Sequence, residues 1–155
     1  MAKAIEIFID ADACPVKDEA YKVAQRYGLR AHVVANAFMQ VPAHPMIHRV
    51  QVDAGPDAAD DWIADRAQAG DVVITSDIPL AERALKAGAA AISPTGRPFT
   101  IDSIGSAVAQ RAIMEQLRST GAVTGGPKPF DRNDRSRFLQ ALDEAINRER
   151  RRRRT

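Results

Sequence analysis

Four aspartates have positions from which their carboxylates could act together on a metal ion or a phosphate. Asp10 and Asp12 follow the first apolar run of the chain, Asp77 follows a later one, and Asp60 lies near the start of a helical segment between them. Clustered carboxylates repel one another and shift toward their protonated forms unless a cation is supplied. Mg²⁺ and Mn²⁺ take a few such ligands, keep waters and accept phosphate oxygens. We therefore predict that these four aspartates are the catalytic residues and the ligands of Mg²⁺ or Mn²⁺.

These aspartates would meet if the chain folds as an open parallel sheet. The apolar patterns predict five strands, over residues 4–9, 29–35, 46–52, 72–75 and 89–92. Helices are predicted between them over residues 15–27, 55–69 and 79–88, and two more follow over residues 101–120 and 132–150. Such alternation predicts a three-layer α/β fold of Rossmann-like type with C-terminal helices. In the strand order 3-2-1-4-5, the strands before Asp10 and Asp77 are neighbours where the winding reverses, and sheets of this type bind ligands there.

Each aspartate also has an ordinary structural explanation. Asp77 or Ser76 could cap the helix that follows, and Asp12 could cap the first helix of the chain. Asp60 could be an exposed acid favoured by the dipole of its helix, and Asp61 becomes the candidate if the helix phase differs. The joint placement of acids at two strand ends favours a metal or phosphate site over these separate explanations.

A second group of polar residues could contact the phosphate groups of a substrate. Its predicted members are Lys17, Asn36, Ser76, Arg97, Lys128 and Arg135, with Arg132 and Arg137 in the same set of cations. For any one of the cations, simple solvation at the surface is the alternative. The glycine pair in Thr124–Pro127 could present backbone amides to phosphate, although such a pair more often forms a turn.

Positive charge is concentrated at the end of the chain. The net charge is +2, but Arg148 and Arg150 to Arg154 supply six positive charges against Glu149, so the remaining residues carry about −3. A basic tail can bind phosphates by releasing their counterions. The alternative is a solvated, frayed helix end.

The length and composition indicate one ordinary globular domain. With 155 residues, 45% hydrophobic and 27% charged, the chain predicts a single domain over residues 1–150 and a basic tail over 151–155. Cys14 is the only cysteine and has no histidine near it in sequence, so we expect a packed thiol, no disulfide and no zinc site. The start of the chain does not resemble a signal peptide and no apolar run is long enough to span a membrane, which together favour the cytoplasm.

Four stretches carry a resemblance that covers almost the whole chain: Ile5–Pro15, Thr75–Ala81, Ser93–Gly96 and Thr124–Pro127. Together they resemble the YaiI/YqxD family of uncharacterised proteins, whose fold is similar to that of PIN-like metal-dependent nucleases. In that resemblance the acidic positions fall at the ends of the first and fourth strands and in an intervening helix. Asp10, Asp12, Asp77 and Asp60 match those positions in turn.

The resemblance and the acids together imply a Mg²⁺- or Mn²⁺-dependent nuclease for RNA or single-stranded nucleic acid, with RNA expected ahead of DNA. One alternative is a phosphohydrolase, because Asp10-Ala11-Asp12 resembles the nucleophile and acid of the haloacid dehalogenase superfamily, with Thr75 or Ser76 after a later strand. The chain departs from that pattern at Cys14, where threonine or valine is usual, and it has no clear late acidic pair. Another alternative is a nucleic-acid-binding module without catalytic activity.

Overall fold

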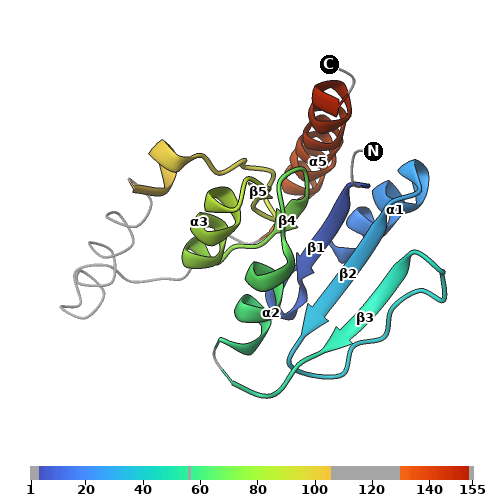
Figure 1. The fold of residues 1–155 in the computed structure, drawn as a ribbon. Helices are drawn as coiled ribbons and strands as arrows, with labels where there is room; N and C mark the ends of the chain where they lie inside the picture. Colours follow the sequence, from blue (N-terminus) through green and yellow to red (C-terminus); the bar gives the residue numbers. More distant parts are fainter. Residues whose placement is uncertain (1–3, 56, 106–129, 154–155) are drawn as a thin grey trace.

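A sheet of five parallel strands forms the middle layer of the protein (Figure 1). The computed structural model describes residues 4–55, 57–105 and 130–153. The strands are β1 (Glu6–Asp10), β2 (Arg30–Ala35), β3 (Ile47–Gln51), β4 (Val72–Ile74) and β5 (Ala90–Ile92). Their order is β3-β2-β1-β4-β5, which confirms the predicted order and the α/β class. All adjacent pairs are parallel, so the carboxyl ends of the strands share one edge.

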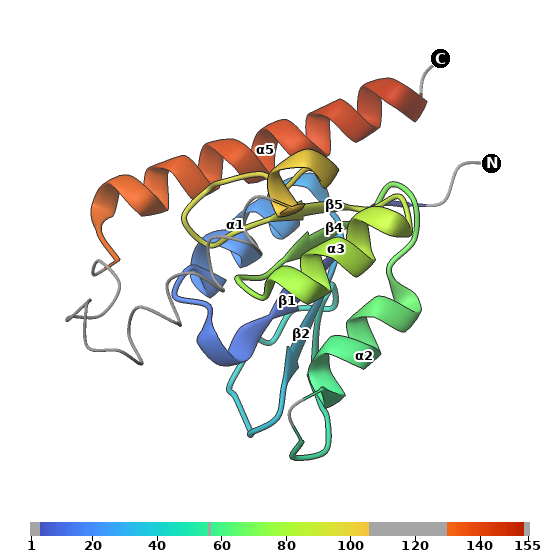
Figure 2. The same cartoon turned by 90° about the vertical axis from the view of Figure 1, so that its left-hand side faces the viewer.

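Helices cover both faces of this sheet (Figure 2). They are α1 (Lys17–Tyr27), α2 (Ala58–Arg66), α3 (Ile78–Lys86) and α5 (Arg132–Arg153), with a 3₁₀ turn, η1 (Ala11–Ala13), after β1. Residues 101–105 are also helical. The rest of the helix predicted over residues 101–120 lies outside the described residues, as do Thr124–Pro127 and Lys128.

The middle strands are apolar because both of their sides are buried. In β1, Ile7 and Ile9 pack in the core beneath α1 and α5, whereas Phe8 points to the opposite core beneath α2 and α3. All three side chains are at most 2% exposed. The sheet therefore separates two hydrophobic cores, and β1 contributes to both.

The boundaries of the helices differ from the predicted ones by a few residues, and α1 and α2 show local reasons for the difference. The helix predicted from Pro15 begins at Lys17, because Cys14 donates its N–H to Ala11 and closes η1 first. Helix α1 ends, as predicted, at Tyr27, and Gly28 caps it in the left-handed conformation with φ of 65°.

Helix α2 ends at Arg66, three residues before the predicted end. Ala67 is already extended, and the buried carboxylate of Asp71 accepts the N–H of Gln68 at 2.9 Å. That hydrogen bond fixes the turn into β4, so the helix cannot continue.

The last helix is an integral part of the fold. Phe138, Leu142 and Ile146 recur every four residues, and all three side chains are fully buried in the core that α1 shares. Helix α5 continues to Arg153, beyond the predicted end at Arg150, so the described part of the basic tail is helical. Within the described ranges, no helix is both long and apolar enough to cross a membrane.

This packing predicts different costs for two neighbouring substitutions. Phe138→Ala removes a fully buried ring and should lower the free energy of unfolding by about 3–5 kcal/mol. Leu139→Ala, at a side chain that is 37% exposed, should lower it by less than about 1 kcal/mol. Urea denaturation of both variants measures the difference, and similar costs would contradict the docking of α5 described here.

Candidate active site

Asp10 is the carboxylate that connects the acidic residues of the site. It ends β1, its side chain is half-buried, and its Oδ2 accepts a hydrogen bond of 2.8 Å from the hydroxyl of Thr75. Burial raises the pKa of Asp10, the Thr75 hydrogen bond opposes that rise, and the charges of Asp77 and Asp12 add to it. The negative charges of two of the other three predicted aspartates therefore act on Asp10.

Thr75 joins the ends of β1 and β4. Its side chain is 1% exposed, and its hydroxyl accepts the backbone N–H of Asp77 at 2.9 Å while donating to Asp10. The spacing of charged residues did not single out Thr75 as a positioning residue for the nuclease site. The signal for it was a hydroxyl placed at the end of an apolar strand, directly before two polar residues.

Asp77 is the N-cap of α3, which confirms the structural role considered for it. Its Oδ1 accepts the backbone N–H of Leu80 at 2.9 Å. This cap occupies one carboxylate oxygen. The charge of Asp77 nevertheless acts on both Asp10 and Asp60, so capping α3 and belonging to the acidic group are compatible.

Helix phase distinguishes Asp60 from its neighbour Asp61. Asp61 has 58% of its side chain exposed and pairs with Arg83 at 2.8 Å, whereas Asp60 is half-buried. Burial raises the pKa of Asp60 to about 6, and the charges of Asp77 and Asp10 add to the rise. Asp60 is thus the residue of this pair that faces the ends of β1 and β4.

Asp12 lies in η1 and is exposed, but the loop after β2 holds it in place. Both of its carboxylate oxygens accept from the backbone N–H of Asn36, at 3.0 and 3.2 Å. The side-chain amide of Asn36 donates to the carbonyl oxygens of Asp53 at 2.9 Å and Gly55 at 3.2 Å. Asn36 therefore positions Asp12 and ties together the loops that follow β2 and β3. Its predicted contact with substrate remains a prediction.

The donor set fits a hard divalent cation through its chemistry. Asp10, Asp60 and Asp77 offer carboxylate oxygens whose mutual repulsion a cation would relieve. In the part of the chain that the structure describes, however, no three His, Cys, Asp or Glu side chains are placed to hold a metal ion by themselves. Mg²⁺ commonly uses one or two carboxylates and completes its shell with waters and phosphate oxygens, so a partial ligand set remains suitable.

Two of the predicted substrate-binding cations already have protein partners. Lys17 donates from Nζ to the carbonyl oxygen of Cys14 at 2.7 Å. Arg135 pairs with Glu19 at 2.9 Å and also donates to the carbonyl oxygen of Pro15 at 3.3 Å. Arg135 therefore fastens α5 to the start of α1, which is a structural contribution that its position in the sequence did not indicate.

Two further predicted substrate-binding residues lie at the surface of the protein. Ser76 is exposed between Thr75 and Asp77, and Arg97 is exposed in the turn after β5. Lys128 lies outside the described residues. For Ser76 and Arg97, contact with a substrate stays a prediction.

Cys14 has the features of a packed thiol, as predicted. Its side chain is 3% exposed, and burial raises the pKa of the thiol above its ordinary value. A cysteine nucleophile requires the opposite shift, toward the thiolate.

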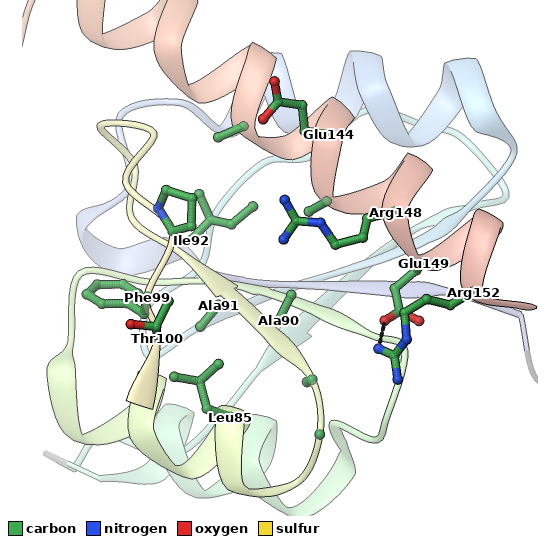
Figure 3. Close-up of a pocket in the computed structure, with 15 residues that line it drawn as sticks. Leu85, Ala90, Ala91, Ile92, Phe99, Thr100, Glu144, Arg148, Glu149 and Arg152 are labelled. Atoms are coloured by element: carbon green, nitrogen blue, oxygen red, sulfur yellow. Dashed lines mark hydrogen bonds and ion pairs between the residues drawn. The ribbon is translucent and has the colours of Figure 1, made fainter. Parts of the chain in front are cut away.

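A hollow of about 240 Å³ lies elsewhere, between β5, α3 and α5 (Figure 3). Its walls include Ala90, Ala91 and Leu85, and charged residues of α5 stand over it. These charged residues are Glu144, Arg148, Glu149 and Arg152. None of the four aspartates lines this hollow, so it is separate from the acidic site.

Comparison with known proteins identifies relatives over nearly the full chain. Residues 8–148 match the family model described as "Uncharacterized BCR, YaiI/YqxD family". A "UPF0178 protein" of Caulobacter sp. (strain K31) is 64% identical over 145 residues, which cover 94% of this chain and 96% of the relative. Another, from Rhodopseudomonas palustris (strain TIE-1), is 60% identical over 147 residues, covering 95% of this chain and 93% of the relative. No solved structure matches the chain significantly.

The raised pKa of Asp60 predicts that replacing this residue increases the stability of the protein, by an amount that depends on pH. That pKa is about 6 in the folded protein against 3.8 ordinarily, so the charged carboxylate disfavours folding increasingly as the pH rises from about 4 through 6. Asp60→Asn should therefore raise the free energy of unfolding at about pH 8 by roughly 1 kcal/mol, allowing for solvent screening, and change it little near pH 3.5.

Urea denaturation in chelator-containing buffer measures this gain. Asp61→Asn is the matched control, because it removes the neighbouring carboxylate from an exposed ion pair and should give no gain at pH 8. Equal effects of the two substitutions, or a gain from Asp60→Asn that is the same at both pH values, would contradict the partly buried placement of Asp60 beside Asp77 and Asp10.

Proposed function

We propose, from the premise that this chain belongs to the YaiI/YqxD family, that it is a Mg²⁺- or Mn²⁺-dependent nuclease. Its substrate is RNA or single-stranded nucleic acid, with RNA expected ahead of DNA, and we place its action in the cytoplasm. Membership of the family rests on the match over residues 8–148 and on relatives that are 60–64% identical. The family itself is described as uncharacterised, so the proposed activity rests on the site.

The observation that supports this function is the mutual influence of three carboxylates at one edge of the sheet. Asp60 carries a pKa of about 6 because it is partly buried beside Asp77 and Asp10. A fold does not gain stability by gathering like charges in a partly buried place. Perturbed carboxylates of this kind cluster at functional sites, where a bound cation or a phosphate group restores the balance of charge.

In this proposal the residues have separate roles. One or two of Asp10, Asp60 and Asp77 would hold the cation, with waters and phosphate oxygens completing its shell. Asp12 would add negative charge beside them, and Thr75 keeps Asp10 in place through its 2.8 Å hydrogen bond. A bound Mg²⁺ or Mn²⁺ supplies an activated water and charge stabilisation for a phosphodiester. Because the acids are negative, the chain needs cations elsewhere to attract a polyanion.

The basic end of α5 can supply part of that attraction. Arg151 and Arg152 are exposed there, and Figure 2 shows this end of the helix on the far side of the molecule from η1 and the start of α3. Arg150 lies over the ring of Tyr27 at 5.4 Å. This arrangement suits non-specific contact with distant phosphates of a long strand rather than with the phosphate at the acids.

The phosphohydrolase alternative receives less support. In that mechanism Asp10 would attack phosphorus and Asp12 would protonate the leaving group. Both oxygens of Asp12 are already within hydrogen-bond distance of the N–H of Asn36, where they act as acceptors. A donor role for Asp12 would require that contact to change.

Cleavage of a labelled single-stranded RNA with Mn²⁺ or Mg²⁺ tests the proposal. Wild-type protein should cleave it, chelator should stop cleavage, and Asp10→Asn should lower the rate by about 100-fold or more, because a charged group beside the reacting phosphate is lost. Asp65→Asn, at an exposed carboxylate on the same helix as Asp60, is the matched control and should cleave like wild type.

A parallel assay with p-nitrophenyl phosphate distinguishes the rival functions. Turnover of this monoester that Asp10→Asn abolishes, with RNA left intact, would replace the nuclease by the phosphohydrolase. A binding module would give a third result: wild type and Asp10→Asn would bind RNA equally well, and neither protein would cleave RNA or the monoester.

A further inference from the structure

The turn after β5 is built around Ser93 and is held by several hydrogen bonds. The backbone N–H of Ser93 donates to the carbonyl of Arg97 at 3.0 Å, and its carbonyl accepts the N–H of Gly96 at 2.9 Å. The hydroxyl of Ser93 accepts the N–H of Arg97 at 3.0 Å and lies 2.9 Å from the hydroxyl of Thr95. These hydrogen bonds fix the backbone from which the side chains of Thr95 and Arg97 extend.

Gly96 brings this turn directly against α5. It has φ of 84°, and a Cβ at this position would collide with the backbone of Arg137 and Phe138. Only glycine therefore permits the observed approach. The consequence is that Arg97 and Arg137, which are 40 residues apart in the sequence numbering, stand on the same side of the molecule.

The two arginines line one open hollow of about 490 Å³, together with Thr95, Gly96, Pro98 and Asp134. Asp134 is buried and caps the start of α5 by accepting the N–H of Asp131 at 3.0 Å, and it also pairs with Arg137. The charge of Arg137 thus balances that of Asp134. Arg97 is exposed, and its guanidinium has no hydrogen-bond or ion-pair partner among the described residues.

The turn that lines the hollow starts near the acidic site. Ile9, Ile74 and Ile92 are in register across β1, β4 and β5. Asp10 directly follows Ile9, and Ser93 directly follows Ile92. Two strand spacings amount to about 10 Å, so the turn starts about that far from Asp10. A polymeric substrate at the acids could reach the hollow, whereas a single small phosphate could not occupy both.

We infer that Arg97, Arg137 and Thr95 form a second phosphate-binding subsite, which holds a backbone phosphate of the nucleic acid next to the one at the acids. The inference rests on the proposed nuclease function. Planar guanidinium groups bind phosphate oxygens through paired N–H donors, and a threonine hydroxyl can donate a further hydrogen bond. In this subsite the Ser93–Gly96 turn holds Arg97 beside Arg137.

Binding of a fluorescent single-stranded RNA in chelator-containing buffer tests the subsite without requiring catalysis. Arg97→Gln should weaken binding about 5- to 10-fold at low salt and reduce the slope of log affinity against log salt by about 0.7, the contribution of one phosphate contact on a single strand. Arg137→Gln should act similarly. Arg97→Gln breaks no side-chain hydrogen bond within the described residues, so it remains informative if Arg137→Gln is destabilised through Asp134.

Arg30→Gln is the matched control, since Arg30 is exposed at the amino end of β2, the opposite edge of the sheet, and should leave affinity unchanged. Binding by Arg97→Gln that equals wild type in affinity and salt slope would overturn the subsite. An equal loss in Arg30→Gln would also overturn it, because general charge would then explain the effect. If the variants lose RNA affinity as expected but wild type never cleaves RNA with metal, the nuclease proposal fails while the subsite stands.

Discussion

The hydrogen bond from the Thr75 hydroxyl to the Asp10 carboxylate joins the two strands at which the sheet reverses its winding. These residues are 65 positions apart in the chain, yet β1 and β4 place them side by side at the carboxyl edge. Because the same hydroxyl accepts the N–H of Asp77, one side chain sets the position of two carboxylates and of the cap that begins α3. The acidic site and the start of the helix above it therefore depend on one buried threonine.

This arrangement costs stability, which indicates a functional reason for it. Asp10 is held partly buried among other carboxylates, and Asp60 is brought beside it with a pKa of about 6. Two partly buried acids elsewhere in the fold have basic partners: Glu6 pairs with His32 at 2.7 Å and Glu19 with Arg135 at 2.9 Å. Like charges left to repel one another at the carboxyl edge of a parallel sheet, where proteins of this class bind ligands, are explained better by the proposed binding of a cation or phosphate than by stability.

Much of the fold was predictable from the sequence, because apolar runs of strand length alternate with helices and few topologies satisfy right-handed crossovers. The placement of Asp10 and Asp77 at neighbouring strand ends followed from that order. The choice between Asp60 and Asp61 did not, because α2 begins at Ala58, later than predicted, and its phase depends on how it packs. Contacts such as Arg135 with Glu19, and the approach of Gly96 to α5, join segments distant in sequence and leave no local signal.

If Asp10, Asp60 and Asp77 together attract a divalent cation, carboxyl NMR with Mn²⁺ should detect it at these residues. The protein is labelled with ¹³C at aspartate carboxyl carbons, the resonances are assigned by substitution, and Mn²⁺ is added in small amounts, since this paramagnetic ion broadens signals of nearby nuclei. We expect the resonances of these three residues to broaden at the lowest Mn²⁺ concentrations, and those of Asp61 and Asp65 only at higher ones, because the broadening falls steeply with distance from the ion. Broadening that is uniform over all exposed aspartates, or that spares the three, would contradict a shared cation site.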